Sequence, residues 1–527
     1  ASTPDPDIVP RIENPGSQSG ETGVVATLQL EASDPNGDSL TFGASGLPPG
    51  LAVDSLTGLI SGTPTTVGNF NVTVTASDGV NSDSASFLWS ISAASTTFTL
   101  HPPPTPAPVL AGTEVSLTAD VTGGTDLEFS WDFDDGTPPT PFSASPVINH
   151  QFTRPGIYYV TVTAVDAGGL PQLATVVVKV HLPVTAAAPA ASSSIILEAL
   201  PGGGERLWVV NPDNDSVTAF DTELNSLLAE IAVGSGPRTL SAVPGAEIWV
   251  VNKDSATITV IDADERTVKR TIGLPYASQP YGIATSPAGD AVYVVLEALG
   301  RLLRLDPSSG AVLAGVDVGP NPRHVALSAD GSRAFVSRFI TRPLPGENTA
   351  VVETTSGGDP LGGEVVVVDT GSMAAVRTIV LRHSDKPDFD IQGRGVPNYL
   401  GAVAISPDGR SAWVPSKQDN IKRGGLRDSQ GLDFKNTVRA ISSRIDLQSE
   451  AEDYGSRIDH DNSGVTSAAA FDGLGLYLFT ALETSRQVAV VDAHGDLEIF
   501  KINAGHAPQG LAYSRDNQLL YVANFMD

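Results

Sequence analysis

Apolar and polar residues alternate in short runs along most of this 527-residue chain, and Gly, Pro, Asn and Asp separate the runs. Residues 8–92 contain VVATLQLEAS, FNVTVTASDG and SASFLWSIS, and residues 97–181 contain EVSLTADV, YYVTVTAVDAGG and ATVVVKV. Alternation with a period of two places successive side chains on opposite faces of a β-strand. Turn residues at this spacing predict two β-sandwiches, over residues 1–94 and 95–182.

Residues 195–527 repeat a different unit. An aromatic residue flanked by apolar residues recurs in RLWVVN, EIWVVN, AVYVVL, RAFVSR, SAWVPS, GLYLFT and LLYVAN. Most of these motifs are about 42 residues apart, a period that indicates a β-propeller with one four-stranded blade per repeat. Seven such motifs predict seven blades. The aromatic residues are Trp208, Trp249, Tyr293, Phe335, Trp413, Tyr477 and Tyr521.

The third strand of each predicted blade ends in Asp, as in SVTAFD, TITVID and QVAVVD. Only six such strands follow the seven aromatic motifs, so the last blade is incomplete in this chain. A sheet that stops after two strands leaves an unpaired edge. We therefore expect that the natural chain continues past Asp527, or that another segment pairs with the last strand.

Between the sandwiches and the repeats, residues 183–194 read PVTAAAPAASSS. Small residues and prolines without apolar periodicity predict a flexible linker. Long amphipathic helical patterns are missing, and 52 Gly and 39 Pro suit a chain rich in turns. The predicted fold is therefore all-β, with two sandwiches, a linker and a seven-bladed propeller.

Each predicted domain resembles a known family. SDPNGDSLTF and the following GLPPGLAVDSLTGLISGTP resemble the putative-Ig, cadherin-like domains of bacterial surface proteins. WDFDDG, followed by HQFTRPGIYYVTVTAVD, resembles the PKD type of Ig-like domain. WVVN and YVAN resemble the strand that gives the YVTN propellers their name. These resemblances imply two Ig-like sandwiches and a seven-bladed propeller, but they imply little about function because propellers have many functions.

Composition restricts the classes of partner and cofactor. A net charge of −29 opposes binding to nucleic acid or to anionic lipid. No run of 18 apolar residues is present, so no membrane span is expected. The chain has no Cys, which excludes disulfides, thiolate metal sites and covalent c-type haem within residues 1–527. The first residue is Ala, and we expect an exported protein, secreted or at the cell surface, with the periplasm as an alternative.

Three insertions interrupt the repeats, at roughly 338–363, 381–397 and 416–440, and antiparallel geometry predicts that they rise from one face of the propeller. Residues 377–444 contain 12 basic and seven acidic residues in an otherwise acidic chain. This pattern predicts a surface for an anionic ligand, a polysaccharide or an acidic protein; the alternative is an internally salt-bridged loop cluster. The candidate residues are Arg338, Arg342, Arg382, His383, Arg394, Lys417, Lys422, Arg423, Arg427 and Lys435.

Calcium is the cation suggested by oxygen-bearing side chains at alternate positions of a loop. The first candidate set is Asp34, Asn36, Asp38 and Asp78, and a weaker one is Asp459 and Asp461. The alternative for the first set is an Asx-turn, in which the side chains accept hydrogen bonds from the backbone.

The sequence shows neither an H-E-x-x-H nor a G-x-S-x-G motif, so we expect no catalytic activity within these residues. The leading hypothesis is a binding scaffold, with the sandwiches as spacers or adhesion modules. RGVPNYLGAVAISPDGRSAWVPS and APQGLAYSRDNQLLYVANFMD also resemble propellers that precede cytochrome-c-peroxidase-like or multihaem domains. That resemblance implies the recognition portion of a larger redox enzyme, partnered by its own C-terminal domain. A surface-layer or filament subunit that assembles through sheet edges is a third hypothesis.

Overall fold

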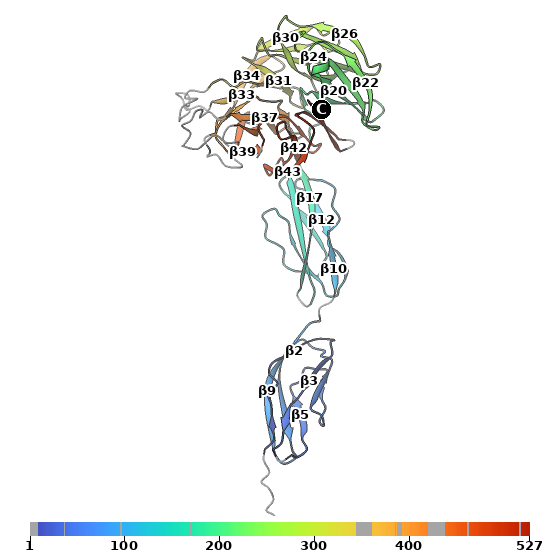
Figure 1. Cartoon of the computed structure of the whole chain (residues 1–527), viewed down its shortest axis with the longest axis vertical. Coiled ribbons are helices and arrows are strands. Elements are labelled where there is room, and N and C mark those ends of the chain that lie inside the picture. The colour runs from blue at the N-terminus through green and yellow to red at the C-terminus, as the bar shows by residue number, and fades with distance from the viewer. Residues whose placement is uncertain are drawn as a thin grey trace, which may run out of the picture. The chain divides into compact units, whose positions relative to one another are not determined.

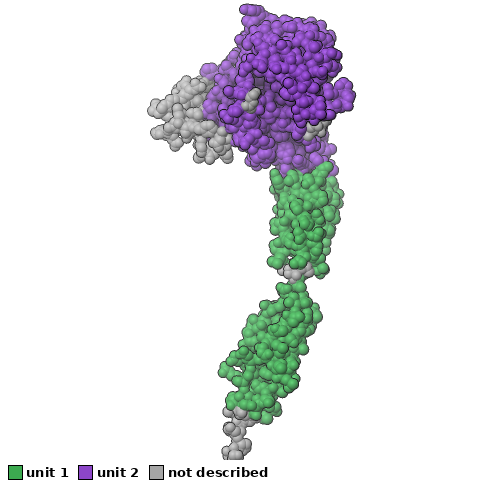
Figure 2. Space-filling model, turned by 45° about the vertical axis from the view of Figure 1, so that its right-hand side comes forward, with its two compact units in different colours: residues 1–107, 114–152, 158–178 green, residues 108–113, 153–157, 179–527 purple. Residues whose placement is uncertain are grey.

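The computed structural model describes residues 9–35, 37–94, 97–167, 170–343, 361–384, 386, 393–419, 438–460, 463–515 and 518–526. These residues form β-strands joined by turns, with one 3-10 turn at Pro212–Asn214, so the all-β prediction is confirmed. The chain divides into two compact units (Figure 2). The first comprises residues 1–107, 114–152 and 158–178, and the second comprises 108–113, 153–157 and 179–527.

The first sandwich is built around a four-stranded sheet in the order β2-β9-β8-β5, facing a three-stranded sheet β3-β7-β6 (Figure 1). Its core holds Trp89 and Ile60, both nearly inaccessible to solvent. The strands are β1 (Arg11–Ile12), β2 (Gln18–Glu21), β3 (Ala26–Gln29), β4 (Ala32–Ser33), β5 (Thr41–Ser45), β6 (Leu51–Val53), β7 (Leu59–Gly62), β8 (Gly68–Ser77) and β9 (Ser82–Ser92).

The second sandwich contains the sheet β11-β17-β16-β14 and the pairs β10-β13 and β12-β15. Trp131, on β14, is 2% exposed and lies in the core of this sandwich. The strands are β10 (Phe98–His101), β11 (Val109–Leu110), β12 (Glu114–Thr118), β13 (Asp120–Gly123), β14 (Glu128–Asp132), β15 (Val147–Gln151), β16 (Gly156–Val165) and β17 (Pro171–His181).

Seven antiparallel sheets follow one another among the described residues after Ala190, and the last of them has two strands. The first sheet is formed by β19 (Ile195–Ala199), β20 (Glu205–Asn211), β21 (Ser216–Asp221) and β22 (Ser226–Ala232). The second is formed by β23 (Pro237–Val243), β24 (Glu247–Asn252), β25 (Thr257–Asp262) and β26 (Thr267–Gly273). The third is formed by β27 (Pro280–Thr285), β28 (Val292–Leu296), β29 (Arg301–Leu305) and β30 (Val312–Asp317).

The other four sheets contain the predicted insertions and the C-terminal strands. The fourth sheet is formed by β18 (Ala190–Ala191), β31 (Pro322–Leu327), β32 (Arg333–Arg338), β33 (Gly362–Asp369) and β34 (Ala374–Arg382), and the fifth by β35 (Val396–Asn398), β36 (Ala404–Ile405), β37 (Ser411–Asp419), β38 (Val438–Asp446) and β39 (Ala451–His460). The sixth is formed by β40 (Thr466–Phe471), β41 (Tyr477–Leu482), β42 (Gln487–Asp492) and β43 (Leu497–Asn503). The last is formed by β44 (Pro508–Ser514) and β45 (Leu519–Asn524).

Apolar side chains fill the interfaces between consecutive sheets. Trp208 packs in the cluster between the first and second sheets, and Trp249 in the cluster between the second and third. The two-stranded sheet packs on both sides, because Leu511 contacts the cluster of β41 and β42, whereas Ala512 contacts that of β19 and β20. The first strand β19 therefore adjoins β44, and the sheets close into a ring.

The aspartates that end the third strands shape the next turn. Asp306 Oδ1 accepts hydrogen bonds from the backbone N–H groups of Ser308 and Ser309, at 3.1 and 2.8 Å. These bonds and the Ser308 hydroxyl stabilise its carboxylate and lower its pKa to about 2. The equivalent aspartates Asp221, Asp262, Asp369, Asp446 and Asp492 bind the turn in the same way. The recurring Asp therefore marks the hairpin turn that follows each third strand.

The segment predicted to be a flexible linker is instead bound inside the ring. Thr185 N donates to Pro407 O at 2.8 Å, and Ser192 N donates to Val325 O at the same distance. Between them β18 pairs with β31, and directly after them Ser193 pairs with Leu240. Small side chains allow this approach. A Cβ at Gly510 would lie 2.3 Å from Ser194 Oγ, which is too close for any other residue type there.

Candidate binding site at the cavity mouth

The three insertions leave the sheets at one end, which we call the insertion end. Pro322 pairs with Arg338, and Gly362 with Arg382, so the first strand begins at the end where β32 and β34 finish. In the next sheet, Val396 and Val438 both pair with Asp419 at the end of β37. The two sheets are joined there, because Thr341 N donates to Asn398 Oδ1 at 3.0 Å. The described flanks of the insertions therefore lie together, as predicted.

A β-bulge interrupts the start of five inner strands at this same end. The register of β23, β27, β31, β40 and β44 shifts directly after the first residue. A bulge leaves a residue outside the ladder and changes the direction of its side chain. One residue displaced by each bulge lines the same cavity; we call these five the mouth ring: Arg238, Tyr281, Arg323, Ser467 and Gln509.

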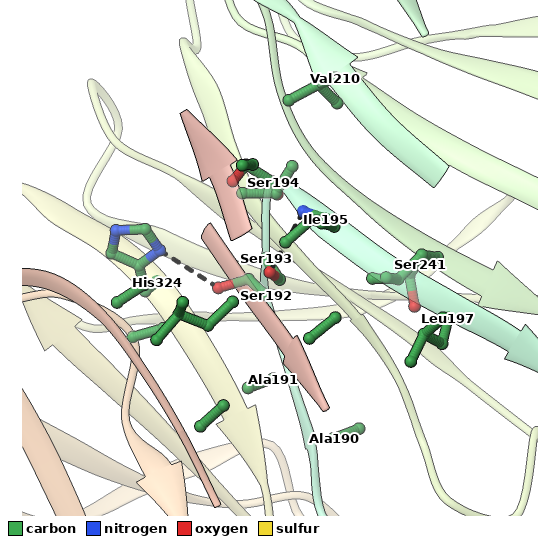
Figure 3. Close-up of a pocket in the computed structure, with 18 of the residues that line it drawn as sticks. Ala190, Ala191, Ser192, Ser193, Ser194, Ile195, Leu197, Val210, Ser241 and His324 are labelled. Atoms are coloured by element: carbon green, nitrogen blue, oxygen red, sulfur yellow. Dashed lines mark hydrogen bonds between the residues drawn. The ribbon is translucent and has the colours of Figure 1, made fainter. Parts of the chain in front are cut away.

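The mouth ring surrounds one end of a cavity of about 1570 Å³ that runs along the inner strands. Residues 188–194 line it from within, and Figure 3 shows Ser192 facing His324. Ser192 Oγ lies 3.3 Å from His324 Nδ1 and accepts a hydrogen bond from Val325 N. Burial, with a smaller contribution from the charge of Arg323, lowers the pKa of His324 to about 3. The neutral ring shares a hydrogen bond with the hydroxyl of Ser192, so His324 anchors the segment.

One carboxylate joins two cations at the mouth. Glu297 Oε2 lies 2.8 Å from Lys253 Nζ, and Glu297 Oε1 lies 2.6 Å from Arg323 NH2. Burial opposes the ionisation of Glu297, but the hydrogen bonds and charges of the two cations outweigh it and lower the pKa of the carboxyl. The carboxylate of Glu297 links three sheets, because Lys253 follows β24, Glu297 follows β28 and Arg323 lies in β31.

A stack of cations and rings, which we call the ladder, continues from the mouth to the insertions. The guanidinium carbon of Arg323 lies 3.2 Å from the centroid of the Phe339 ring. Phe339 stacks on Tyr399, and Lys417 Nζ lies 3.7 Å from the centroid of Tyr399. Lys417 in turn pairs with Asp419 at 3.1 Å. The ladder therefore connects the cavity mouth to the bases of all three insertions.

The structure pairs several of the predicted binding residues internally. Arg338 binds Glu364 and donates from Nε to Val318 O at 2.9 Å, and Lys417 is held in the ladder. His383 is half-buried, and its backbone N–H donates to Leu361 O. These contacts match the alternative of an internally bonded cluster, because a charge taken partly out of water requires a partner.

Other predicted residues remain accessible. Arg342 and Arg382 are exposed, and Arg394 is half-buried. The guanidinium of Arg382 lies 3.7 Å from the centroid of Tyr454, a ring that Lys386 and Arg457 also approach. The predicted residues Lys422, Arg423, Arg427 and Lys435 lie outside the described residues.

The calcium prediction falls partly outside the described residues, since Asn36 and Asp461 are not among them. Asp78 Oδ1 accepts hydrogen bonds from Val80 N and Asn81 N, and Asp34 Oδ1 accepts one from Asp38 N at 3.2 Å. Asp459 pairs with Arg439 at 2.9 Å. Over the part of the chain that the structure describes, no group of three His, Cys, Asp or Glu residues is arranged around a metal position. Calcium therefore stays a prediction.

A buried hydrogen-bond chain resembles a hydrolytic triad in its distances. Ser442 Oγ lies 2.9 Å from His460 Nε2, and His460 Nδ1 lies 2.7 Å from Glu498 Oε2. Ser442 and His460 are almost completely inaccessible, and neither lines a described cavity. A nucleophile must reach its substrate, so the chain of bonds acts as a link between β38, β39 and β43.

Sequence reasoning missed the mouth ring, although the sequence contains a signal for it. The inner strands begin with Pro followed by the ring residue in GPRT, QPYG, NPRH and APQG, at positions 237, 280, 322 and 508. Proline at a strand start lacks the N–H that would continue the ladder. The repeat of Pro-x at the blade period therefore marks the bulge, and the residue after it marks the cavity.

Two family models match the N-terminal part of the chain. Residues 9–92 match the putative Ig domain, and residues 97–179 match the PKD domain. No curated protein matches the sequence. The chain therefore carries both Ig-like domains that the sequence predicted.

Solved structures resemble the remainder. Hydrazine synthase of Kuenenia stuttgartiensis shares 18% identity, with a TM-score of 0.50, over 65% of this chain and 94% of that chain. The Cps50 (Swd1) β-propeller domain of Myceliophteria thermophila shares 10% over 63% and 93%, with a TM-score of 0.42. Virginiamycin B lyase from Staphylococcus aureus shares 13% over 66% and 96%, with a TM-score of 0.42. These identities bear on the fold alone, and the propeller prediction is confirmed. The YVTN type and the number of blades stay predictions.

These domains together are the architecture of a protein-interaction scaffold. PKD and Ig-like domains are typical of extracellular proteins. Among the described residues, no helix has the length and apolar character needed to cross a membrane.

Proposed function

We propose that the protein is an extracellular binding scaffold whose propeller binds an acidic segment of a partner protein at the insertion end. The observation that carries the proposal is the grouping of exposed cations at the bases of the insertions. Arg342, Arg382 and Lys386 are all exposed there, on a chain with a net charge of −29. A basic area on an acidic body selects acidic partners and steers their approach.

The ladder and the strand ends support this surface with a rigid base. Binding segments on a rigid scaffold lose less conformational freedom when they engage a partner. Arg382 is held over Tyr454, and its backbone N–H donates to Glu452 Oε2 at 2.9 Å. The insertion end thus presents cations whose positions are partly fixed before a partner arrives.

Labelled poly-L-glutamate tests the proposal, with the full chain and fluorescence anisotropy at low and raised salt. We expect binding that weakens with salt, because exposed charges are screened. The variant R342E/R382E/K386E should bind roughly tenfold more weakly, since exposed pairs contribute about 0.2–1 kcal/mol each. The control R410E reverses an exposed charge just before β37, in the neighbouring sheet and at the end away from the insertions. Absence of binding, or equal losses in both variants, would overturn the proposal.

Two other hypotheses from the sequence stay predictions: the recognition portion of a larger redox enzyme, and a surface-layer subunit. The specific partner, secretion and self-assembly through sheet edges are predictions as well.

A further inference from the structure

We propose that the mouth of the central cavity is a separate site for a small carboxylate, which Arg238 binds through its guanidinium group. Arg238 is displaced by the bulge at the start of β23 and lines the cavity. Its Nε is buried and has no hydrogen-bond partner, and Arg238 forms no ion pair with any residue in the described ranges. A half-buried guanidinium with an open donor is the feature that a ligand carboxylate satisfies.

Arg238 differs from the neighbouring cations in lacking an ion pair, and not in its Nε, because the Nε atoms of Arg323 and Arg270 are also buried without a hydrogen-bond partner. Arg323 and Lys253, at the same mouth, share the carboxylate of Glu297. Elsewhere in the ring, Arg206 pairs with Glu198, and Arg270 pairs with Glu247. The fold therefore supplies an acid to these partly buried arginines but not to Arg238. Because leaving a charge partly desolvated without a partner is costly, the open position next to Arg238 points to an anion from outside the chain.

The surroundings specify a small, polar ligand. Thr239, next to Arg238, donates from Oγ1 to the backbone oxygen of Tyr281 at 2.5 Å, so these two ring positions are adjacent. Gln509 and Ser467 line the same cavity, where Gln509 Nε2 donates to Glu483 Oε2 at 3.3 Å and Ser467 Oγ donates to Pro508 O at 3.1 Å. Both faces of Phe339 are occupied, by Arg323 and Tyr399, and Tyr399 is covered by Lys417. A ligand therefore has no free ring face on Phe339 or Tyr399 to stack against. A guanidinium group, by contrast, can form two parallel hydrogen bonds to a planar carboxylate.

The cavity is large enough for such a molecule, at about 1570 Å³, and residues 188–194 line it from within. Residues 188–194 reach the mouth ring at Ser194. The preceding residue, Ser193, pairs with Leu240 on β23. Arg238 lies on that same strand. A carboxylate at Arg238 therefore lies between the bound segment and the mouth, and it uses a different residue from Arg342, Arg382 and Lys386, which carry the proposed protein-binding surface.

Isothermal titration calorimetry on the full chain tests the site with three separate probes, sodium acetate, succinate and glucuronate, and with inorganic phosphate for comparison. We expect at least one carboxylate to bind and to raise the melting temperature of the propeller, because a ligand that binds only the folded state stabilises it. The variant R238Q should bind that probe roughly tenfold or more weakly, while R238K retains part of the affinity. The control R410Q should bind like the wild type.

Three outcomes would overturn the inference: no carboxylate binds the wild type, only phosphate binds, or R238Q binds as tightly as R410Q does. Melting curves of R238Q establish that the variant is folded. The result is independent of the proposed function, since R238Q should bind poly-L-glutamate normally and R342E/R382E/K386E should bind the small carboxylate normally. Failure of either site is thereby distinguished from failure of the other.

Discussion

The rings of Phe339 and Tyr399 stack with their centroids 4.4 Å apart and their planes 16° from parallel. Phe339 directly follows β32, and Tyr399 directly follows β35, so the contact joins two sheets at the point where two insertions meet them. Tyr399 has a φ of 53°, in the left-handed region that ring-bearing residues rarely adopt. The stack and the hydrogen bond from Leu400 N to Phe339 O, at 3.2 Å, hold it in that conformation.

Replacing Phe339 with Ala should loosen the insertion end without unfolding the ring. The substitution removes the ring that separates Arg323 from Tyr399, and an aromatic pair contributes about 0.5–1.5 kcal/mol beyond its burial. We expect amide hydrogen exchange at Thr341 and Leu400 to become roughly tenfold faster. The control F500A removes a ring that is 52% exposed on β43 and should leave both rates unchanged. Equal protection in F339A and the wild type would show that the stack does not hold these loops.

The segment 184–194 should resist proteolysis in the folded protein, in contrast to what its composition suggests. Its backbone is hydrogen-bonded to Pro407, Val325 and Leu240, whereas proteases cut exposed loop tips and termini. We expect elastase, which cleaves after small residues, to leave this segment intact at protease levels that cut loop tips. The variant S192P lacks the N–H that donates to Val325 O, and should be cut more readily. Mass spectrometry of the fragments locates the cuts, and rapid cleavage of the wild type here would contradict the structure.

The local features of the fold were predictable from the sequence because they depend on neighbouring residues. Trp208, Trp249 and Trp413 are fully buried as the aromatic repeat requires. The aspartates at the ends of third strands fix turns only two or three residues away, and their spacing located the strands. The PKD-like sandwich was equally predictable, since its strands show the alternation of apolar and polar residues and Trp131 is buried in the core.

The features that depend on contacts between distant residues were not predictable in this way. Ala190 and Ala191 form a strand because β31 offers an unpaired inner edge, and nothing in their own composition favours that pairing. Arg238 and Arg323 look like ordinary charged residues after a proline, but the bulges place both at one cavity. Arg338 looks like a candidate ligand-binding residue until Glu364, on the adjacent strand, is seen beside it.

Lowering the pH should reduce the stability of the propeller, because His324 is buried in its neutral form. Its pKa falls from 6.5 in a model peptide to about 3 in the folded protein, so the folded state binds fewer protons than the unfolded state between these values. The free energy of unfolding therefore decreases as the pH falls below 6.5, with a slope that approaches about 1.4 kcal/mol per pH unit for one group. The variant H324Q should lose this part of the slope in urea titrations between pH 6.5 and about 5. Identical slopes for the wild type and H324Q would contradict a buried, neutral His324.

The Ser442–His460–Glu498 chain should behave as a structural link and not as a catalytic group. His460 bridges a hydroxyl and a carboxylate, and burial raises the cost of leaving either without a partner. For Glu498 burial opposes ionisation, but the hydrogen bond and charge of His460 outweigh it and lower the pKa of the carboxyl. The variant H460A removes that support and opens a cavity, so we expect it to lose about 2–4 kcal/mol of stability in urea unfolding.

The variant S442A removes one hydroxyl and should lower the free energy of unfolding by only about 1 kcal/mol. Comparison with H460A then separates the loss of one hydrogen bond from the loss of the bridging ring. A fluorophosphonate that labels activated serines should not modify Ser442 in the folded wild type, because its side chain is inaccessible. Labelling of Ser442 that disappears in H460A would instead mean that solvent and substrate reach the hydroxyl, and that these three residues form an active site.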